Sequence, residues 1–291
     1  ITAAAVSAAL VLILGLVYAI RATSRESTDD AFITGHIISV SARVDGHVQK
    51  VNISDNQRVN EGDLLVKLDP NDYKVKFELA QAALAQCSAQ ADMAAVEADR
   101  AEKDYNRYKQ LFDANAGVTQ QQLDNATAAA RSAKAQLNSA NSRIAEAKAS
   151  LEQAVLNLSY TNIRAPQAGQ IAKKSIEAGE YIRAGQPVLN IVTPDVWVVA
   201  NFKETQLKNM KPGQPVKIKV DAHPQKAFKG HIDSIQSGTG SIFSLLPPEN
   251  ATGNYIKVVQ RVPVKIVFDE DPNDVNMLSP GMSVIPVVKV K

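Results

Sequence analysis

The spacing of apolar residues changes along the chain, and each change predicts a different kind of element. Residues 2–20 are apolar and carry no charge. Residues 42–68 and 165–191 alternate between apolar and polar positions, a period-two pattern that is typical of short strands. A seven-residue period fills the stretch between them, and alternating segments return after residue 192. The pattern therefore predicts an elongated α+β chain in which β segments flank a long helical insertion.

Residues 2–20 are long enough to cross a membrane as one helix. At about 1.5 Å per residue they span roughly 28 Å, close to the hydrocarbon thickness of ~30 Å. A cleaved signal peptide would have a shorter apolar region. Here apolarity continues through Tyr18 and Ile20 and stops at Arg21. We therefore expect an uncleaved transmembrane helix over residues 1–21, with a cleaved signal peptide as the alternative.

Segments 42–68 and 165–191 are two copies of one motif. They align without a gap at a constant offset of 123 residues, which brings Gly46 onto Gly169. Each copy contains a few short strands separated by glycine-bearing turns. Half a sandwich of this size buries too little apolar surface to be stable alone. The two copies should therefore pack on each other around a pseudo-two-fold axis.

Between the two copies, small or apolar residues recur at the a and d positions of a heptad repeat. One run extends from Phe77 to Phe112 and the other from Leu123 to Leu158. Consecutive heptads with polar residues elsewhere are typical of a coiled coil. Two such helices would project about 60 Å. The pair is suited to reaching a distant partner, and the alternatives are a structural spacer or a dimerisation rod.

A short turn separates the two heptad runs. Residues 113–117 break the pattern, and Thr119 with Gln122 three positions later matches the start of a helix with a capping box. Helices joined by so short a turn must run antiparallel. The insertion is therefore predicted to be a long antiparallel coiled-coil hairpin.

After residue 192 the chain reads as alternating strands punctuated by Pro-Gly, which predicts an antiparallel barrel or sandwich. Residues 28–41 are also strand-like and are expected to join the same unit. The predicted organisation is nested: a transmembrane helix at 1–21, a β-barrel domain at 28–41 and 193–291, a lipoyl/biotinyl-like β-sandwich at 42–69 and 160–192, and the hairpin at 70–159.

One loop departs from the alternating pattern. Residues 237–254 form a stretch bounded by glycine and proline that contains Ile242, Phe243, Leu245 and Leu246. An exposed apolar patch marks a contact surface, here for the membrane, a transporter or the next protomer. The alternative is that these side chains fold back over the barrel as a plug.

Charge and chemistry narrow the function classes. The chain has 32 basic and 30 acidic residues, a net charge of +2, so we expect no nucleic-acid partner. Its four histidines show no metal-ligand spacing, and its one cysteine, Cys87, falls at a d position. We find no Ser/His/Asp order, no P-loop and no recognisable acid pair, so the sequence predicts no enzyme, metal or cofactor.

The glycine and apolar spacing of the two copies resembles the half-motifs of biotinyl/lipoyl domains. Those domains present a modified lysine on the turn that joins their halves. In this chain roughly ninety residues replace that turn, between Asp69 and Ala165. The carrier lysine has no counterpart, which argues against a swinging-arm carrier.

The predicted anchor, the sequence TDDAFITG at residues 28–35, the split half-motifs, the hairpin and the barrel together resemble the membrane fusion proteins, or periplasmic adaptors, of the HlyD family. Residues 238–266 are similar to the EmrA-type adaptors that serve major-facilitator drug exporters. The resemblance implies a single-pass inner-membrane protein with a periplasmic body. It also implies an inner-membrane transporter partner, a TolC-like outer-membrane channel and a homo-oligomeric ring of three or six copies.

Adaptors that dock TolC-type channels often carry Arg, then Leu four residues on, then Ser eleven residues on, across the hairpin tip. Arg107 and Leu111 fit this pattern, but position 118 is Val118 and the nearest hydroxyl belongs to Thr119. The resemblance therefore implies a channel contact through Arg107, Leu111 and Thr119. The alternatives are a solvated charge for Arg107 and a helix cap for Thr119.

The resulting hypothesis is a periplasmic adaptor of a tripartite efflux or secretion system that links a major-facilitator drug exporter to a TolC-like channel. Three alternatives stay open: an adaptor of an ABC-type exporter, a membrane-tethered structural coiled-coil protein, and a lipoyl-type carrier. The adjacent gene would separate the exporter classes, and an intact-mass measurement would detect a modified lysine.

Overall fold

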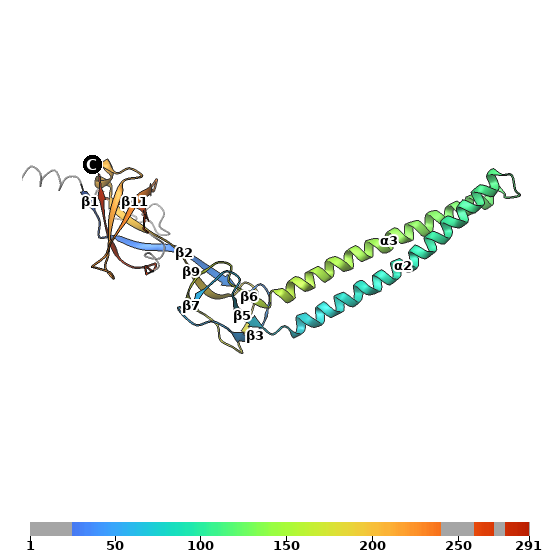
Figure 1. The fold of residues 1–291 in the computed structure, drawn as a ribbon, viewed down its shortest axis with the longest axis horizontal. Coiled ribbons are helices and arrows are strands. Elements are labelled where there is room, and N and C mark those ends of the chain that lie inside the picture. The colour runs from blue at the N-terminus through green and yellow to red at the C-terminus, as the bar shows by residue number, and fades with distance from the viewer. Residues whose placement is uncertain (1–24, 240–258, 271–276, 291) are drawn as a thin grey trace, which may run out of the picture.

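The structure is a computed structural model that describes residues 25–239, 259–270 and 277–290. In Figure 1 the molecule is elongated, with a β-rich barrel at one end, a smaller β-sandwich in the middle and a pair of long helices at the other end. No helix in the described ranges has both the length and the apolarity to cross a membrane. The transmembrane helix predicted at residues 1–21 lies outside these ranges.

The barrel is an antiparallel sheet built from both ends of the chain. Its neighbouring strands follow the order β1, β13, β10, β11, β12, β9, and β2 pairs with the other edge of β9. Their bounds are β1 Arg25–Ser27, β2 Ala31–Ser41, β9 Pro187–Lys203, β10 Pro215–Val220, β11 Ala227–Ile235, β12 Arg261–Phe268 and β13 Val284–Lys289, with a 3-10 helix, η1, at Glu204–Asn209 between β9 and β10.

Strand β2 closes the barrel. The Ile33 amide donates to the Met282 carbonyl over 2.9 Å, and the Gly281 amide donates to the Ile33 carbonyl over 2.8 Å. Alternate residues of the strands point inward and form one apolar core, in which Phe202 and Phe228 are the largest fully buried side chains. Strand β1 precedes residue 28, where the barrel was predicted to begin, because its three polar residues give no alternating signal.

The sandwich confirms the predicted pseudo-two-fold axis. Its strands recur at the offset of 123 residues: β3 Gly46–Val51 with β7 Gly169–Lys174, β4 Arg58–Val59 with β8 Tyr181–Ile182, β5 Leu64–Leu68 with the start of β9, and the end of β2 with β6 Asn162–Arg164. The pairings are reciprocal, since β3 pairs with β8 as β7 pairs with β4, and β5 pairs with β6 as β9 pairs with β2.

Individual hydrogen bonds and buried side chains of the sandwich also occur in pairs. Gly185 N donates to Ala42 O over 2.8 Å, and the equivalent bond joins Gly62 N to Ala165 O over 2.9 Å. The core holds equivalent apolar residues from both copies, such as Leu68 and Ile191 or Val48 and Ile171, each at most 2% exposed. Neither copy could bury these side chains alone, which is the physical reason for the duplicated arrangement.

Two long strands connect the barrel to the sandwich. Strand β9 has 17 residues and pairs with the 11-residue β2 through both units, with a bulge between Gly35 and Ile37. The boundary predicted between residues 192 and 193 falls inside β9, and no loop separates the two units there. Alternation continues across this point, so the sequence offers no punctuation at which to divide the strand.

Two helices, α2 at Asn71–Asp113 and α3 at Gln120–Ser159, occupy most of the insertion. Their 43 and 40 residues correspond to lengths of about 65 and 60 Å. They lie side by side and antiparallel in Figure 1. The residues at the predicted a and d positions are buried or half-buried in both helices, except Tyr108, which is 37% exposed. Supercoiling of the pair stays a prediction.

Candidate functional site

The tip of the hairpin presents two of the three residues implied as channel contacts on one side of α2. Arg107 and Leu111 are separated by four residues, so they lie one turn apart on the same helix face. Leu111 is 39% exposed, although it is apolar, and Arg107 is exposed and forms an ion pair with Asp104. The tip therefore offers an exposed apolar side chain beside a charged one.

Thr119 has a structural role at the start of α3. Its hydroxyl accepts from the Gln122 amide over 3.3 Å, and the Gln122 side chain accepts from the Thr119 amide over 2.9 Å. These reciprocal bonds confirm the predicted capping box. The turn before it uses Gly117 at φ 76°, a backbone conformation that glycine adopts without strain. The Thr119 hydroxyl is therefore already used as the cap of α3. The Leu111 side chain, in contrast, is exposed and has no such role in the helix.

The base of the hairpin is packed against the sandwich. Tyr73 of α2 and Tyr160, which follows α3, both contact the apolar core of the sandwich. The Tyr73 hydroxyl donates to the Asp45 carbonyl oxygen over 2.8 Å, and burial followed by the nearby Asp45 charge raises the pKa of Tyr73. The guanidinium of Arg43 lies 5.0 Å from the centre of the Tyr160 ring. These contacts fix the direction in which the hairpin leaves the sandwich.

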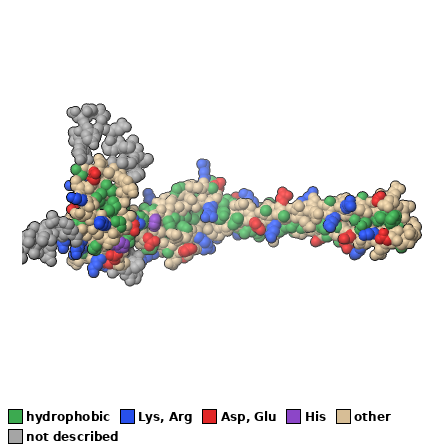
Figure 2. All heavy atoms as spheres, turned by 90° about the horizontal axis from the view of Figure 1, so that it is seen from above, with side chains coloured by type: hydrophobic (Ala, Val, Ile, Leu, Met, Phe, Trp, Pro, Cys, Tyr) green, Lys and Arg blue, Asp and Glu red, His purple; other side chains and the backbone are tan. Residues whose placement is uncertain are grey.

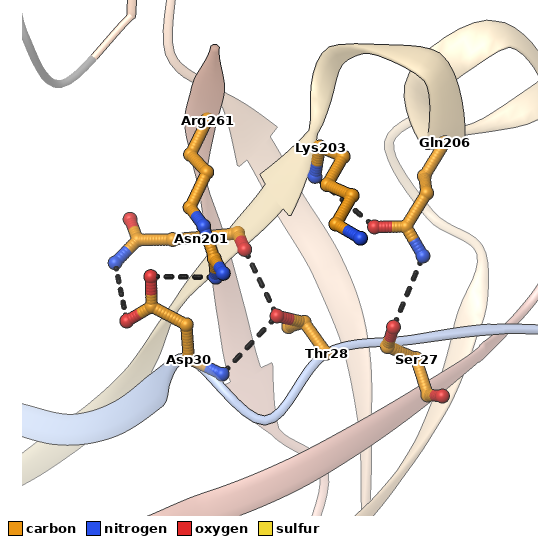
Figure 3. Close-up of polar contacts among 7 residues, drawn as sticks. All are labelled: Ser27, Thr28, Asp30, Asn201, Lys203, Gln206 and Arg261. Atoms are coloured by element: carbon orange, nitrogen blue, oxygen red, sulfur yellow. Dashed lines mark hydrogen bonds and ion pairs between the residues drawn. The ribbon is translucent and has the colours of Figure 1, made fainter. Parts of the chain in front are cut away.

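At the other end of the molecule, the segment that enters the barrel is held by a polar network (Figure 3). The Thr28 hydroxyl donates to the Asn201 carbonyl over 2.9 Å and accepts from the Asp30 amide over 3.2 Å. The two Asp30 carboxylate oxygens accept from Asn201 Nδ2 over 3.1 Å and from Arg261 over 2.7 Å. We call Thr28, Asp30, Asn201 and Arg261 the entry clamp.

The Gln206 side chain extends this attachment toward β1. Its amide nitrogen donates to the Glu26 carboxylate over 2.9 Å and to the Ser27 carbonyl over 3.0 Å. Residues 26–30 are thus tied to β9, η1 and β12, three elements that are distant in the sequence. Because residues 1–24 immediately precede this segment, the entry clamp fixes where the chain joins the barrel.

We expect Thr28→Val to loosen the segment that enters the barrel. Thr28 is 7% exposed, so the substitution leaves the Asn201 carbonyl without its donor and costs about 1–3 kcal/mol of local stability. Hydrogen exchange of the amides of residues 25–31 should accelerate by about tenfold or more. Ser27→Ala is the matched control. Ser27 is the exposed residue next to Thr28, and its hydroxyl makes no bond to the entry clamp. Equal acceleration in both variants would contradict the assigned role of Thr28.

A cleft of about 550 Å³ lies where the barrel meets the sandwich. Its walls come from β2, β4, β7 and β9 and from the segment before β13. Its lining includes Ile37, Arg58, Gln170, Thr193, Leu278 and Pro280. The pseudo-two-fold axis relates Arg58 and Gln170 to Tyr181 and His47, whose rings pack edge to face 5.0 Å apart at the hairpin end. The hairpin end of the sandwich therefore carries a pair of packed, exposed rings where the barrel end has the cleft.

Within the residues that the structure describes, no group of three or more His, Cys, Asp or Glu side chains is arranged to hold a metal ion. His36 packs against Trp197 with ring centres 4.9 Å apart, and His231 pairs with Asp269 over 2.5 Å. Each of these histidines has a structural partner.

The arrangement of barrel, duplicated sandwich and inserted helices matches known protein families. The model described as "RND MFP, barrel-sandwich hybrid domain" matches residues 36–194, more than half of the chain. The model described as "AAEA-like beta-barrel domain" matches residues 195–289. The chain belongs to the membrane fusion protein family. The predicted family is thereby confirmed, and the mixed α/β barrel-sandwich fold agrees with it.

Named bacterial proteins resemble the chain over most of its length. The multidrug export protein EmrA of Haemophilus influenzae is 37% identical to this chain. The alignment covers 91% of this chain and 76% of the relative. The fatty acid resistance protein FarA of Neisseria gonorrhoeae is 36% identical, covering 88% of this chain and 74% of the relative. The chain is thus an EmrA-like membrane fusion protein.

Solved structures show the same fold. MacA from Actinobacillus actinomycetemcomitans superimposes with a TM-score of 0.72 at 22% identity, covering 91% of this chain and 80% of MacA. The periplasmic adaptor protein EmrA superimposes with a TM-score of 0.52 at 20% identity, covering 91% of this chain and 98% of that structure. At these identities the likeness concerns the fold alone.

The structure places the predicted contact residues unevenly. Arg107 and Leu111 lie together at the tip of this membrane fusion protein, and Thr119 caps the adjacent helix. The predicted contact loop with Ile242, Phe243, Leu245 and Leu246 falls outside the described residues. The entry clamp was not predicted from the sequence. Residues 28–35 were interpreted only as a motif that resembles the family, and no contact was assigned to Thr28 or Asp30. The spacing of Thr28 and Asp30 indicates a local turn, but nothing in the sequence identifies their distant partners.

Proposed function

We propose that this chain is the periplasmic adaptor of a tripartite efflux system, linking an inner-membrane exporter to an outer-membrane channel. The observation that carries the proposal is the position of a helical hairpin about 60 Å long at the end opposite the barrel. The relatives of the chain include proteins named for multidrug export and for fatty acid resistance. An adaptor works by geometry, and a long rod attached to a rigid block is suited to holding two partners at a fixed distance.

The finer assignments follow the same family. The exporter is of the major-facilitator type, the channel is TolC-like, and several copies of the chain form a ring. An N-terminal transmembrane helix at residues 1–21 anchors the chain, with the entry clamp as the first fixed point of the body. The similarity to EmrA proteins supports these assignments. The apolar residues Ile242, Phe243, Leu245 and Leu246 serve as a contact for the exporter, the membrane or the next copy.

Deletion of the gene tests the proposed function directly. The strain should become at least fourfold more susceptible to several unrelated drugs, and the full chain supplied on a plasmid should restore resistance. The tagged full chain, purified from membranes, should retain an integral exporter with many spans and an outer-membrane channel. Unchanged susceptibility together with the absence of both partners would exclude the adaptor function, whereas an ATPase in the complex would replace the assigned exporter class.

We expect charge reversal at the hairpin tip to weaken export without unfolding the chain. The double variant Arg107→Glu, Leu111→Ser changes two exposed side chains on one helix face, so the stability cost is within about 1 kcal/mol. Removal of an apolar contact together with reversal of a charge should lower channel co-purification and resistance at least fourfold. Lys109→Glu is the matched control, because Lys109 is exposed on a different side of the same turn. An equal loss in the control would contradict a contact specific to Arg107 and Leu111.

A further inference from the structure

The outer wall of the barrel carries a group of exposed basic side chains on four neighbouring strands. In β1, β13, β10 and β11 alternate residues point away from the apolar core. Five of these outward positions hold basic residues, which we call the basic face: Arg25, Lys217, Lys219, Lys229 and Lys289. Figure 2 shows Lys and Arg side chains along the edge of the barrel that lies farthest from the hairpin.

The strand register places four of these cations in two like-charge pairs. Lys217 lies directly opposite Lys229 across β10 and β11, and Arg25 lies directly opposite Lys289 across β1 and β13. Glu26 alternates to the other side of β1 and does not offset these charges. Like charges at directly opposite positions destabilise a sheet. An anionic partner on the basic face would relieve this repulsion.

The chain itself does not neutralise the basic face. None of its five cations has an acidic partner within 4 Å among the residues that the structure describes. Three acidic residues border the face: Asp221 follows β10, and Asp269 and Glu270 follow β12. Asp269 pairs with His231, and Glu270 accepts from the Lys229 amide. Five basic and three acidic side chains leave a net charge of +2, equal to that of the entire chain.

Apolar side chains lie beside the basic face. Ile285 is directly opposite Lys219 and is 38% exposed. Phe32 of β2 is paired with Ser283, two residues from Ile285 in β13, and is 42% exposed. Basic side chains next to an aromatic ring and an aliphatic side chain suit the headgroup region of a bilayer, where charged groups meet phosphates and apolar groups enter the acyl boundary.

The basic face lies where the proposed anchor joins the barrel. Arg25 belongs to the face, and only residues 22–24 separate it from the transmembrane helix proposed at residues 1–21. A fully extended chain of that length spans at most about 15 Å. In Figure 1 strand β1 lies on the side of the barrel away from the hairpin. A membrane that holds the anchor is therefore within reach of this face, with the hairpin on the far side of the barrel.

We propose that the basic face docks on the anionic phospholipid headgroups of the membrane that holds the anchor. Each Lys or Arg close to an anionic lipid surface is attracted to it, and the attraction extends over about 8–10 Å at physiological salt. Lipid phosphates would offset both like-charge pairs, and Phe32 and Ile285 would enter the headgroup region. Docking would set the tilt of the barrel on the membrane, and with it the direction of the hairpin. The inference rests on the anchor assigned under the proposed function.

Fluorescence quenching by lipid headgroups tests this docking in the full chain. The background is Cys87→Ala, and Ala227→Cys, at an exposed position directly opposite Lys219, carries a fluorophore. The chain is inserted into nanodiscs of phosphatidylcholine alone or with about 30% phosphatidylglycerol. Both kinds of disc contain the same fraction of a lipid with a spin label on its headgroup, which quenches only at short range.

Quenching should be at least threefold stronger in the anionic discs than in the neutral discs. Addition of about 1 M NaCl should remove the difference, since the Debye length then falls to about 3 Å. A fluorophore on Ala149→Cys, an exposed position on α3 far from the barrel, should show no quenching in either disc. This comparison needs no substitution in the basic face, so it stands even if the variants below are unstable.

Three charge reversals then test the contribution of the basic face: Lys217→Glu, Lys219→Glu and Lys229→Glu. They should remove most of the extra quenching in anionic discs while the circular dichroism spectrum is unchanged. The matched control reverses three exposed lysines of the sandwich and the hairpin: Lys50→Glu, Lys134→Glu and Lys148→Glu. It makes the same change in net charge and should retain the full difference between the two lipids.

Elution of the chain with the discs separates failure of this inference from failure of the anchor. Equal quenching in both kinds of disc would overturn the docking, because the anchor alone would then hold the barrel near the bilayer. A chain that elutes with the discs without any quenching has its basic face turned away from the lipid. Elution apart from the discs would refute the anchor, and the docking with it. Shielding of the fluorophore from iodide that requires the co-purified exporter would instead assign the face to an acidic surface of that protein.

Discussion

Replacing residues 71–159 with a short glycine-containing turn is expected to abolish drug resistance while the barrel and the sandwich stay folded. The two ends of the hairpin enter adjacent strands, as the Leu68 amide donates to the Thr161 carbonyl over 2.8 Å. A turn can therefore close this gap without moving β5 or β6. The sandwich core is formed by its own strands, and of the deleted residues only Tyr73 packs against it.

The shortened chain would resemble a simple duplicated sandwich attached to a barrel, with nothing to span the distance to a channel. Drug susceptibility should equal that of the strain that lacks the gene. Circular dichroism should show a cooperative thermal transition, with most of the helical signal lost. The exporter should still co-purify, because the barrel and its flanking segments are intact. Full resistance in the shortened chain would show that the hairpin takes no part in export.

Gly169→Ala is expected to destabilise the sandwich by about 3 kcal/mol, a large effect for a single methyl group. A Cβ atom at this position would lie 2.4 Å from the Val192 carbonyl oxygen and 2.6 Å from an Ile191 side-chain carbon. The oxygen belongs to β9, which is paired with β2 on its other side, so it cannot move without breaking that pairing. The thermal midpoint should fall by about 10–20 °C.

Another position on β7, three residues along, offers a control for Gly169→Ala. Ala172→Ser lies on the same strand, β7, and is exposed, so the thermal midpoint should change by less than about 3 °C. Differential scanning calorimetry of the purified chain measures both variants. A midpoint for Gly169→Ala within the range of the control would mean that β7 and β9 separate more readily than their backbone spacing indicates.

Repetition within the sequence made the central part of the fold predictable. The gapless offset that places Gly46 on Gly169 also places each strand of the sandwich on its counterpart, because side chains at equivalent positions are buried against one another. The heptad spacing identifies the less exposed side of α2 and α3, and the pair Thr119 and Gln122 marks the first turn of α3. These signals are local and periodic, so they can be recognised without knowing what packs against them.

Contacts between distant segments could not be predicted in this way. Asp30 and Arg261 are separated by 231 residues and pair through partly exposed side chains, so neither hydrophobic pattern nor spacing identifies them. Strand β1 consists of Arg25, Glu26 and Ser27 and is defined by its pairing with β13. The contact residues at the tip depend on partners outside the chain, and the sequence gives only their exposure and the family resemblance.

The ladder between β2 and β9 has a mechanical consequence. At about 3.3 Å per residue, β9 extends roughly 56 Å, and its hydrogen bonds lie across the long axis of the molecule. A pull between barrel and sandwich along that axis loads the bonds in shear, so many of them must break together. Bonds loaded by peeling would fail one at a time. Tension that arises when an exporter changes shape would therefore be transmitted to the hairpin. The barrel and the sandwich would move together, with little deformation where they meet.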